Sequence, residues 1–212
     1  MLGKFIVFEG IDCCGKDTQI DLLQQYISQN NLDEKFVFTR EPGSPLFSLN
    51  QDIRNILLNS KDEIDQKTES LLFAADRAYH VEKIKEILSK GIHVICNRYF
   101  YSTIAYQYQQ NQDKHFFDLI EYSTDYLVPD IYFYLSISEE ELITRKQNKM
   151  NLDRIEQKTM NYFLKVLNKY DNMFFNLPYH LVPKNTYQID GSKDRFIIAD
   201  EIKKILKEKE IL

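Results

Sequence analysis

The segment Gly10-Ile11-Asp12-Cys13-Cys14-Gly15-Lys16 has two glycines and a lysine in the spacing G-x-x-x-x-G-K. It follows a short apolar run and precedes a helical pattern, which is the context that a phosphate-binding loop requires. Glycines let backbone N–H groups converge on a phosphate without obstruction by a Cβ, and the following helix N-terminus adds the positive end of its dipole. The motif therefore predicts a strand–loop–helix unit that binds a nucleoside triphosphate.

Apolar runs alternate with longer helical stretches along the rest of the chain, which indicates a mainly parallel sheet with crossover helices. Nearly unbroken apolar runs are typical of strands that are buried on both faces. We expect strands near residues 4–8, 36–39, 93–96, 131–135 and 187–189. The predicted fold class is α/β, a P-loop NTPase-type three-layer fold with a central, mainly parallel five-stranded sheet flanked by helices, formed as a single domain over residues 1–212.

The helices are expected where apolar residues recur on one face. Ser138 and Glu141 have the spacing of a capping box, which predicts a helix from about Glu139. The other expected helices are one directly after the phosphate loop, one over 68–89, one over 154–175, and a closing helix marked by Ile198, Ile202 and Ile205.

The charge balance bears on the partners of the chain. The formal net charge is −5, so no general affinity for nucleic acid or an anionic membrane is expected, and cations that bind an anionic substrate must be clustered. No apolar run reaches the roughly 18 residues of a membrane helix, and no signal-peptide pattern is found. Three cysteines without ligand spacing favour reduced thiols, and a cytoplasmic location is expected.

The loop and the residues directly after it are the expected ATP contacts. Lys16 is expected to reach the β- and γ-phosphates, and Thr18 to hydrogen-bond the α-phosphate. Asp17 occupies the position that is normally Ser or Thr, whose hydroxyl binds Mg²⁺; a carboxylate is also a ligand for a hard cation, although it adds negative charge. The full predicted set is Gly10, Ile11, Asp12, Cys13, Cys14, Gly15, Lys16, Asp17 and Thr18, together with Arg145 farther along the chain, and Asp17 is the candidate metal ligand.

Four further motifs follow the loop in order, and together with residues 8–12 they resemble the thymidylate kinase family from residue 4 to about 175. They are Thr39-Arg40-Glu41-Pro42-Gly43, Leu71 to Arg77, Asn97-Arg98-Tyr99 with Ser102 and Ala105-Tyr106-Gln107, and Leu152-Asp153-Arg154-Ile155-Glu156. The resemblance implies a transferase of nucleotide biosynthesis, an ATP-dependent kinase that uses Mg²⁺ to convert dTMP to dTDP on the way to dTTP. It also implies a homodimer.

The resemblance assigns substrate contacts to these motifs. Asp12 would accept a hydrogen bond from the sugar 3′-hydroxyl, and Arg40 would hold the monophosphate by bidentate hydrogen bonds. Phe73 and Arg77 are four residues apart on one helix face, so Phe73 would stack on thymine while Arg77 donates to its O4. Two alternatives stay open: Asp12 could instead stabilise the turn, and Phe73 could simply pack in the core.

The third motif supplies further contacts. Arg98 would touch the phosphate that is transferred, and Tyr106 would crowd the 2′ position of the sugar and exclude ribose. Ser102 and Gln107 are the candidate donors or acceptors for the pyrimidine edge. In the family usually an Asp, not Asn97, precedes the arginine; Asp17 and Asn97 are therefore interpreted as a compensated pair, in which the carboxylate has moved across the metal site.

A lid segment is expected at about residues 145–156. Because cysteines occupy the phosphate loop, the chain resembles the kind of family member that carries its catalytic arginine in the lid, with Arg154 and Arg145 as candidates. An ion pair of Arg154 with Glu156 or Asp153 stays open. The predicted catalytic residues are thus Lys16, Arg98 and Arg154. Two alternatives remain: a kinase for another deoxynucleoside or its monophosphate, and a non-catalytic nucleotide-binding protein with an altered metal site.

Overall fold

The computed structural model describes residues 2–108, 115–148, 150, 153–173 and 177–212. Its centre is a parallel sheet in the order β2-β3-β1-β4-β5. The predicted α/β class with five strands is confirmed, and every strand pairing is parallel. The strands are β1 Phe5–Glu9, β2 Phe36–Arg40, β3 His93–Asn97, β4 Ile131–Ser136 and β5 Thr186–Asp190.

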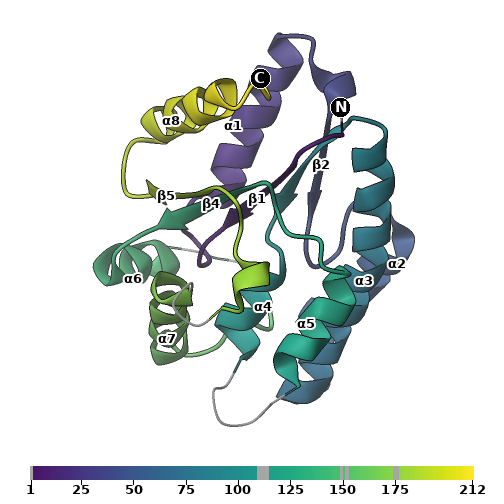
Figure 1. Ribbon diagram of the computed structural model, residues 1–212. Coiled ribbons are helices and arrows are strands. Elements are labelled where there is room, and N and C mark those ends of the chain that lie inside the picture. The colour runs from purple at the N-terminus through teal and green to yellow at the C-terminus, as the bar shows by residue number, and fades with distance from the viewer. Residues whose placement is uncertain (1, 109–114, 149, 151–152, 174–176) are drawn as a thin grey trace.

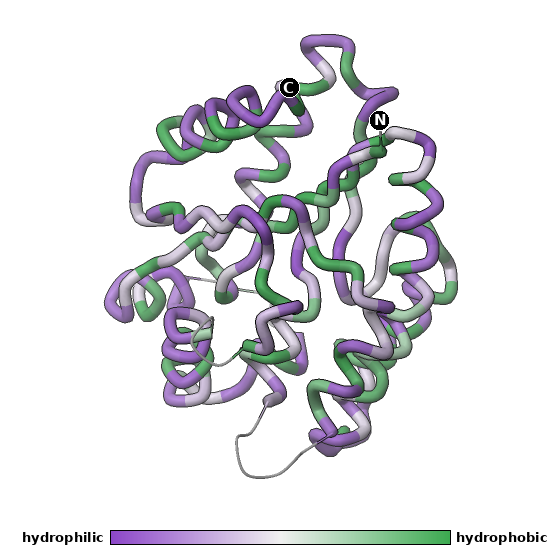
Figure 2. Tube along the Cα trace, viewed as in Figure 1, coloured by the Kyte–Doolittle hydropathy of each residue, from purple (hydrophilic) through white to green (hydrophobic). Residues whose placement is uncertain are grey.

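Helices cover both faces of this sheet, which is why the central strands read as nearly unbroken apolar runs. Helices α1 and α8 lie on one face, and α3, α4, α5 and α7 lie on the other (Figure 1). Figure 2 shows apolar residues along the central strands and mixed polarity along the outer helices. The helices are α1 Lys16–Gln29, α2 Ser48–Asn59, α3 Gln66–Ser89, α4 Phe100–Gln107, α5 Phe116–Thr124, α6 Glu139–Gln147, α7 Met160–Asp171 and α8 Arg195–Glu208.

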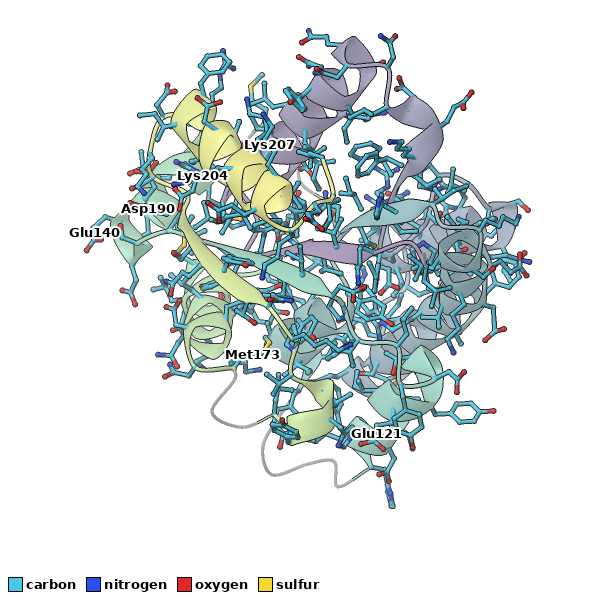
Figure 3. The ribbon with its side chains drawn as sticks, turned by 45° about the horizontal axis from the view of Figure 1, so that its top comes forward. Glu121, Glu140, Met173, Asp190, Lys204 and Lys207 are labelled. Atoms are coloured by element: carbon cyan, nitrogen blue, oxygen red, sulfur yellow. The ribbon has the colours of Figure 1, made fainter. Side chains whose placement is uncertain are left out.

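The amphipathic pattern of α8 gives it one buried side. Ile198, Ile202 and Leu206 are buried in the main core, whereas Lys204 and Lys207 are exposed on the outer side (Figure 3). No helix in the part of the chain that the structure describes is both long enough and apolar enough to cross a membrane.

Two of the predicted helix starts have different outcomes. Helix α6 begins at Glu139 as expected, because the Ser138 hydroxyl accepts a hydrogen bond from the backbone N–H of Glu141 at 3.2 Å. The helix predicted from residue 154 is wrong at its start, since α7 begins at Met160. The Asp153 carboxylate accepts the N–H groups of Ile155 and Glu156 at 2.9 Å each, and this holds the residues before α7 in a turn of their own. The predicted end near 175 falls among residues 174–176, outside the described residues.

Candidate active site

The phosphate loop connects the buried strand β1 to the first turn of α1. Gly10 has φ 140° and Gly15 has φ 101°, a region that side chains with a Cβ rarely adopt. A Cβ on Gly10 would also lie 2.5 Å from the carbonyl oxygen of Leu135. These two positions therefore need glycine, and the backbone between them can turn toward a phosphate at the N-terminus of α1.

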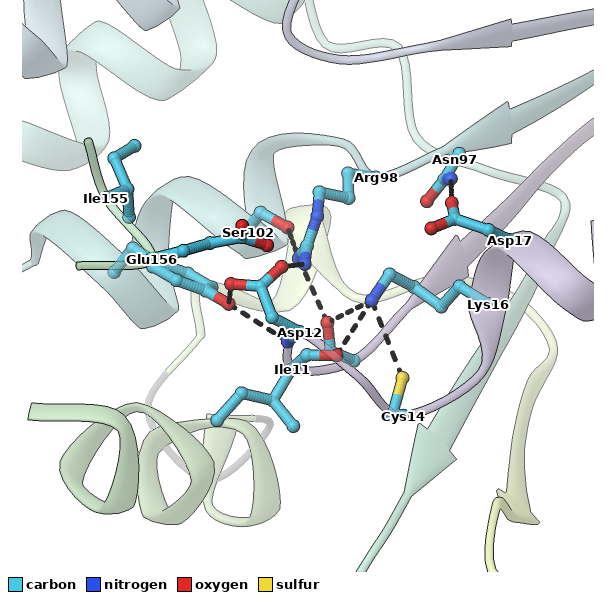
Figure 4. A network of polar contacts seen from close by, with 12 residues as sticks. Ile11, Asp12, Cys14, Lys16, Asp17, Asn97, Arg98, Ser102, Ile155 and Glu156 are labelled. Atoms are coloured by element: carbon cyan, nitrogen blue, oxygen red, sulfur yellow. Dashed lines mark hydrogen bonds and ion pairs between the residues drawn. The ribbon is translucent and has the colours of Figure 1, made fainter. Parts of the chain in front are cut away.

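The side chain of Lys16 is folded back over the loop. Its Nζ donates to the carbonyl oxygens of Gly10 at 2.8 Å and Ile11 at 2.9 Å, and only 5% of the residue is exposed (Figure 4). Carbonyl oxygens bear only partial charge, so triphosphate oxygens are far stronger partners for this ammonium group.

The loop forms one wall of a cavity of about 890 Å³. The cavity lies at the carboxyl ends of β1, β2 and β3, which is where open α/β sheets bind ligands. The cavity is lined by residues that are predicted to contact ATP and by residues that are predicted to contact the monophosphate acceptor. They are Asp12, Cys13, Gly15, Lys16, Asp17, Thr18, Arg40, Phe73, Arg77, Arg98, Ser102, Tyr106, Gln107 and Arg145. Gly10, Ile11, Cys14 and Arg154 do not line it.

Arg98 lines this cavity and joins several predicted site residues. Its Nη2 donates to the Asp12 carboxylate at 2.5 Å, and its Nη1 donates to the Gly10 carbonyl oxygen at 2.9 Å and to the Ser102 hydroxyl at 2.9 Å (Figure 4). Tyr106 donates to the other oxygen of Asp12 at 2.8 Å. The structure thus brings together Asp12 and Tyr106, which are predicted to contact the sugar, and Arg98, which is predicted to contact the phosphate that is transferred.

Behind Arg98 lies Glu9, which is fully buried and which the sequence interpretation did not assign. Its carboxylate accepts from the backbone N–H of Tyr99 at 2.7 Å and from the hydroxyls of Ser102 at 2.7 Å and Tyr170 at 2.9 Å. The Ser102 hydroxyl proton is therefore committed to Glu9. The Ser102 oxygen also accepts from Arg98 Nη1, so Ser102 helps to position Arg98.

Arg77 and Gln107, which line the cavity as Phe73 does, each have a buried side-chain atom with no partner among the described residues. Arg77 donates through Nε to Glu41 at 2.9 Å and through Nη2 to Thr103 at 2.8 Å, which leaves Nη1 unpaired. Gln107 donates through Nε2 to Glu69 at 2.9 Å, which leaves its Oε1 unpaired. An unpaired buried polar atom costs roughly 1–3 kcal/mol, so a ligand that pairs with both gains that amount at each.

Phe73 packs in a small apolar cluster with Leu57 and Ile155, apart from the main core. It is 9% exposed and lines the cavity, so core packing and a contact with a base are both open to it.

Two further arginines, Arg40 and Arg54, line the cavity. Arg40 is exposed, and its Nε makes only a long contact of 3.4 Å to the Gly43 carbonyl oxygen. Arg54 also lines the cavity, and its Nη1 donates to the Pro42 carbonyl oxygen at 2.7 Å. Burial, and then the charge of Arg40, lower the pKa of Arg54. Arg54 was not predicted, because no signal in the sequence placed α2 against this cavity.

The two lid arginines lie in different surroundings. Arg145 spans the phosphate loop and the end of β5, donating to the carbonyl oxygens of Cys13 at 3.1 Å and Gly191 at 2.8 Å. Arg154 donates to Glu69 at 2.5 Å and to the Leu57 carbonyl oxygen at 2.8 Å. Its ion-pair partner is therefore Glu69, where Glu156 and Asp153 were the expected alternatives. The structure places Arg145, and not Arg154, beside the phosphate loop.

Asn97 and Asp17 are in direct contact, because the Asn97 amide nitrogen donates to the Asp17 carboxylate (Figure 4). The amide oxygen of Asn97 is buried and has no partner among the described residues. Over residues 2–108, 115–148, 150, 153–173 and 177–212, no three His, Cys, Asp or Glu side chains lie close enough together to hold a metal ion.

A parallel sheet in this order, with a phosphate loop after its first strand and an arginine-lined acceptor side facing that loop, defines a P-loop nucleoside monophosphate kinase. The model of the family described as thymidylate kinase matches residues 8–190. The chain belongs to the thymidylate kinase family.

Three thymidylate kinases are similar to this chain along nearly their whole length. A thymidylate kinase from Trichormus variabilis is 36% identical over 212 residues, covering 97% of this chain and 96% of the relative. One from Prochlorococcus marinus (strain NATL2A) is 40% identical over 219 residues, covering 99% of this chain and 100% of the relative. One from Thermosipho africanus is 38% identical over 205 residues, covering 95% of this chain and 96% of the relative.

Proposed function

We propose that this chain transfers the γ-phosphoryl group of ATP to dTMP and releases dTDP and ADP. The observation that carries the proposal is the pair of unpaired buried atoms, one a donor on Arg77 and the other an acceptor on Gln107. Thymine presents an acceptor, O4, next to a donor, N3–H. The pocket offers the complementary pair, whereas cytosine presents the reverse order.

The proposed roles follow the two sides of the cavity. The phosphate loop, with Lys16 and Arg145, binds the ATP phosphates. Arg40 and Arg54 hold the dTMP phosphate, and Arg98 lies between the two sides, where it neutralises charge on the phosphoryl group that is transferred. An oxygen of the acceptor phosphate then attacks the γ-phosphorus in line, so no nucleophile from the protein is needed.

Asp12 and Tyr106 are proposed to contact the sugar. The Asp12 carboxylate can accept from the 3′-hydroxyl, and Tyr106, held on Asp12, occupies the space beside it. Closure of the lid, residues 145–156, over both nucleotides would exclude water. Lys149, Asn151 and Leu152 of that segment lie outside the described residues.

Mg²⁺ is the proposed cofactor. The residues present fit it: Asp17 offers a carboxylate oxygen, and the unpaired Asn97 amide oxygen can accept from a water molecule bound to the ion. Bound with ATP, the ion would neutralise phosphate oxygens. We also propose that the chain is cytoplasmic and forms a homodimer; light scattering on the purified chain would check the homodimer.

A coupled assay of ADP release tests the function directly. The acceptors are dTMP, dUMP, dCMP, the purine deoxynucleoside monophosphates and thymidine, and Lys16→Met serves as the blank. We expect dTMP to exceed dCMP by at least about 100-fold in kcat/KM, because cytosine leaves both buried atoms mispaired. Release with dTMP no faster than in the blank, or equal use of dCMP, would overturn the proposal.

A further inference from the structure

Glu69 is a buried residue of α3, four residues before Phe73 and eight before Arg77, but the proposed mechanism gives it no role. The residue is 3% exposed. One carboxylate oxygen accepts from Gln107 Nε2 at 2.9 Å, and the other accepts from Arg154 Nη2 at 2.5 Å. Lys158 Nζ lies 4.0 Å from the carboxylate, so two cations compensate its buried charge.

The contact with Glu69 decides which way round the Gln107 amide lies. A side-chain amide can present either its NH₂ donor or its carbonyl acceptor, but a carboxylate only accepts. Gln107 must therefore turn its NH₂ group toward Glu69, and its Oε1 is left buried and without a partner in the described structure. Arg77 presents a donor whichever way its side chain is turned, because a guanidinium only donates hydrogen bonds.

We infer that Glu69 is a positioning residue that makes the pocket selective for thymine, by fixing Gln107 with its acceptor available to the base. The inference rests on the proposed function, since it concerns the same site. Without Glu69, the Gln107 amide can rotate by half a turn and offer a donor, which pairs with the N3 acceptor of cytosine. Glu69 acts on selectivity through Gln107 and does not itself line the cavity.

Arg154 gives the substitution Glu69→Gln a defined consequence. Because Arg154 only donates, it retains the carbonyl oxygen of the introduced glutamine, whose NH₂ group then faces Gln107. Gln107 must then accept through its Oε1, so the NH₂ group of Gln107 is turned toward the base. The substitution inverts the hydrogen bonding of the pocket, while the contacts of residue 69 with Arg154 and Gln107 each keep a donor and an acceptor. Only the longer contact with Lys158 loses its acceptor among the three contacts described here.

The experiment measures kcat/KM for dTMP and for dCMP in the wild type and in Glu69→Gln. The ratio of the two values should fall by about tenfold or more, the cost of one mispaired buried hydrogen bond. A purely structural loss would lower both values together and leave the ratio unchanged. Glu82→Gln, an exposed position on the same helix, is the matched control and should keep the wild-type ratio.

A double variant tests whether the change in selectivity comes from the reversed hydrogen bond at Gln107 or from the loss of the Glu69 charge. In the double variant Glu69→Gln with Gln107→Glu, the carboxylate moves to α4, accepts from the introduced amide and offers its other oxygen to the base. The ratio should return to within about threefold of wild type, as expected for directly coupled residues.

The outcomes are distinguishable. A wild-type ratio in Glu69→Gln, or no recovery in the double variant, overturns the inference, and so does a double variant that fails to fold, because it keeps a donor and an acceptor in the contacts of residue 69 with residues 107 and 154. A wild-type chain without dTMP turnover would instead overturn the proposed function.

Discussion

The side-chain amide of Asn97 donates to the carboxylate of Asp17 and so joins the end of β3 to the first turn of α1. The two residues are 80 positions apart in the chain, yet both depart from the pattern expected around the bound metal. Their contact gives a structural basis for treating the two departures as one change, in which the carboxylate has moved from the sheet edge to the helix.

The first prediction tests this exchange with a double-mutant cycle. Asp17→Ser removes the carboxylate, and Asn97→Asp places two carboxylates in contact, so each single change should lower kcat/KM at saturating Mg²⁺ by about tenfold or more. The double variant restores one carboxylate and should recover to within about fivefold of wild type. The affinity for Mn²⁺ in the presence of ATP, measured by electron paramagnetic resonance, should likewise fall in each single variant and recover in the double variant. Additive losses would refute the exchange.

The strands and the phosphate loop can be predicted from the sequence, whereas contacts between distant residues cannot. The five strands follow from unbroken apolar runs, and the loop follows from glycines whose backbone angles other residues rarely adopt. The partner of Arg154 could not be foreseen, because Glu69 is 85 residues away and nearer carboxylates were available. Spacing within a motif predicts a local shape, but it does not choose among long-range partners.

The same limit applies to other parts of the site. Ser102 reads as a base contact from its motif, yet its hydroxyl donates to the fully buried Glu9, because a buried carboxylate must collect donors. The late start of α7 arises from the Asp153 carboxylate, whose hydrogen bonds to the backbone compete with helix formation. In both cases tertiary or local polar contacts override the pattern of the sequence.

The second prediction separates the two lid arginines. Arg145→Met removes a guanidinium that contacts the phosphate loop, so the Kd for ATP should rise by about tenfold or more. Arg154→Met should leave the Kd for ATP within about twofold, because Arg154 contacts Glu69 and Leu57. Titration of each variant with ATP measures this. Equal weakening in both variants would mean that Arg154 reaches the phosphates when ATP binds.

The third prediction concerns Arg98, whose removal should affect both turnover and stability. Arg98→Ala should lower kcat by at least about 1,000-fold, because charge on the transferred phosphoryl group loses its central cation. It also leaves the Asp12 carboxylate without its cation, so the free energy of unfolding should fall by about 3 kcal/mol. Arg195→Ala, an exposed arginine at the start of α8, is the control and should change neither quantity. Normal turnover by Arg98→Ala would remove Arg98 from the mechanism.

The last prediction follows from Asp76, a fully buried residue on α3. Burial, and then the nearby Glu41, raise the pKa of its carboxyl group to about 6, against the opposing effect of hydrogen bonds from Asn50 and Gly43. Between about pH 4 and about pH 6 the folded chain therefore holds a proton that the unfolded chain has lost. The contribution of Asp76 to stability is present at the acid end of this window and is lost as the pH rises.

Asp76→Asn removes this titration, which isolates it from the other carboxylates. Urea unfolding should show wild type losing about 2 kcal/mol relative to Asp76→Asn between about pH 4 and about pH 7.5. Asp52→Asn, an exposed aspartate on α2, matches the change in charge and should give no such difference. If the wild type instead gained stability relative to Asp76→Asn over this range, the carboxyl group would be stabilised in its charged form by Asn50 and the Gly43 N–H. Its hydrogen bonds, and not its burial, would then dominate its energetics.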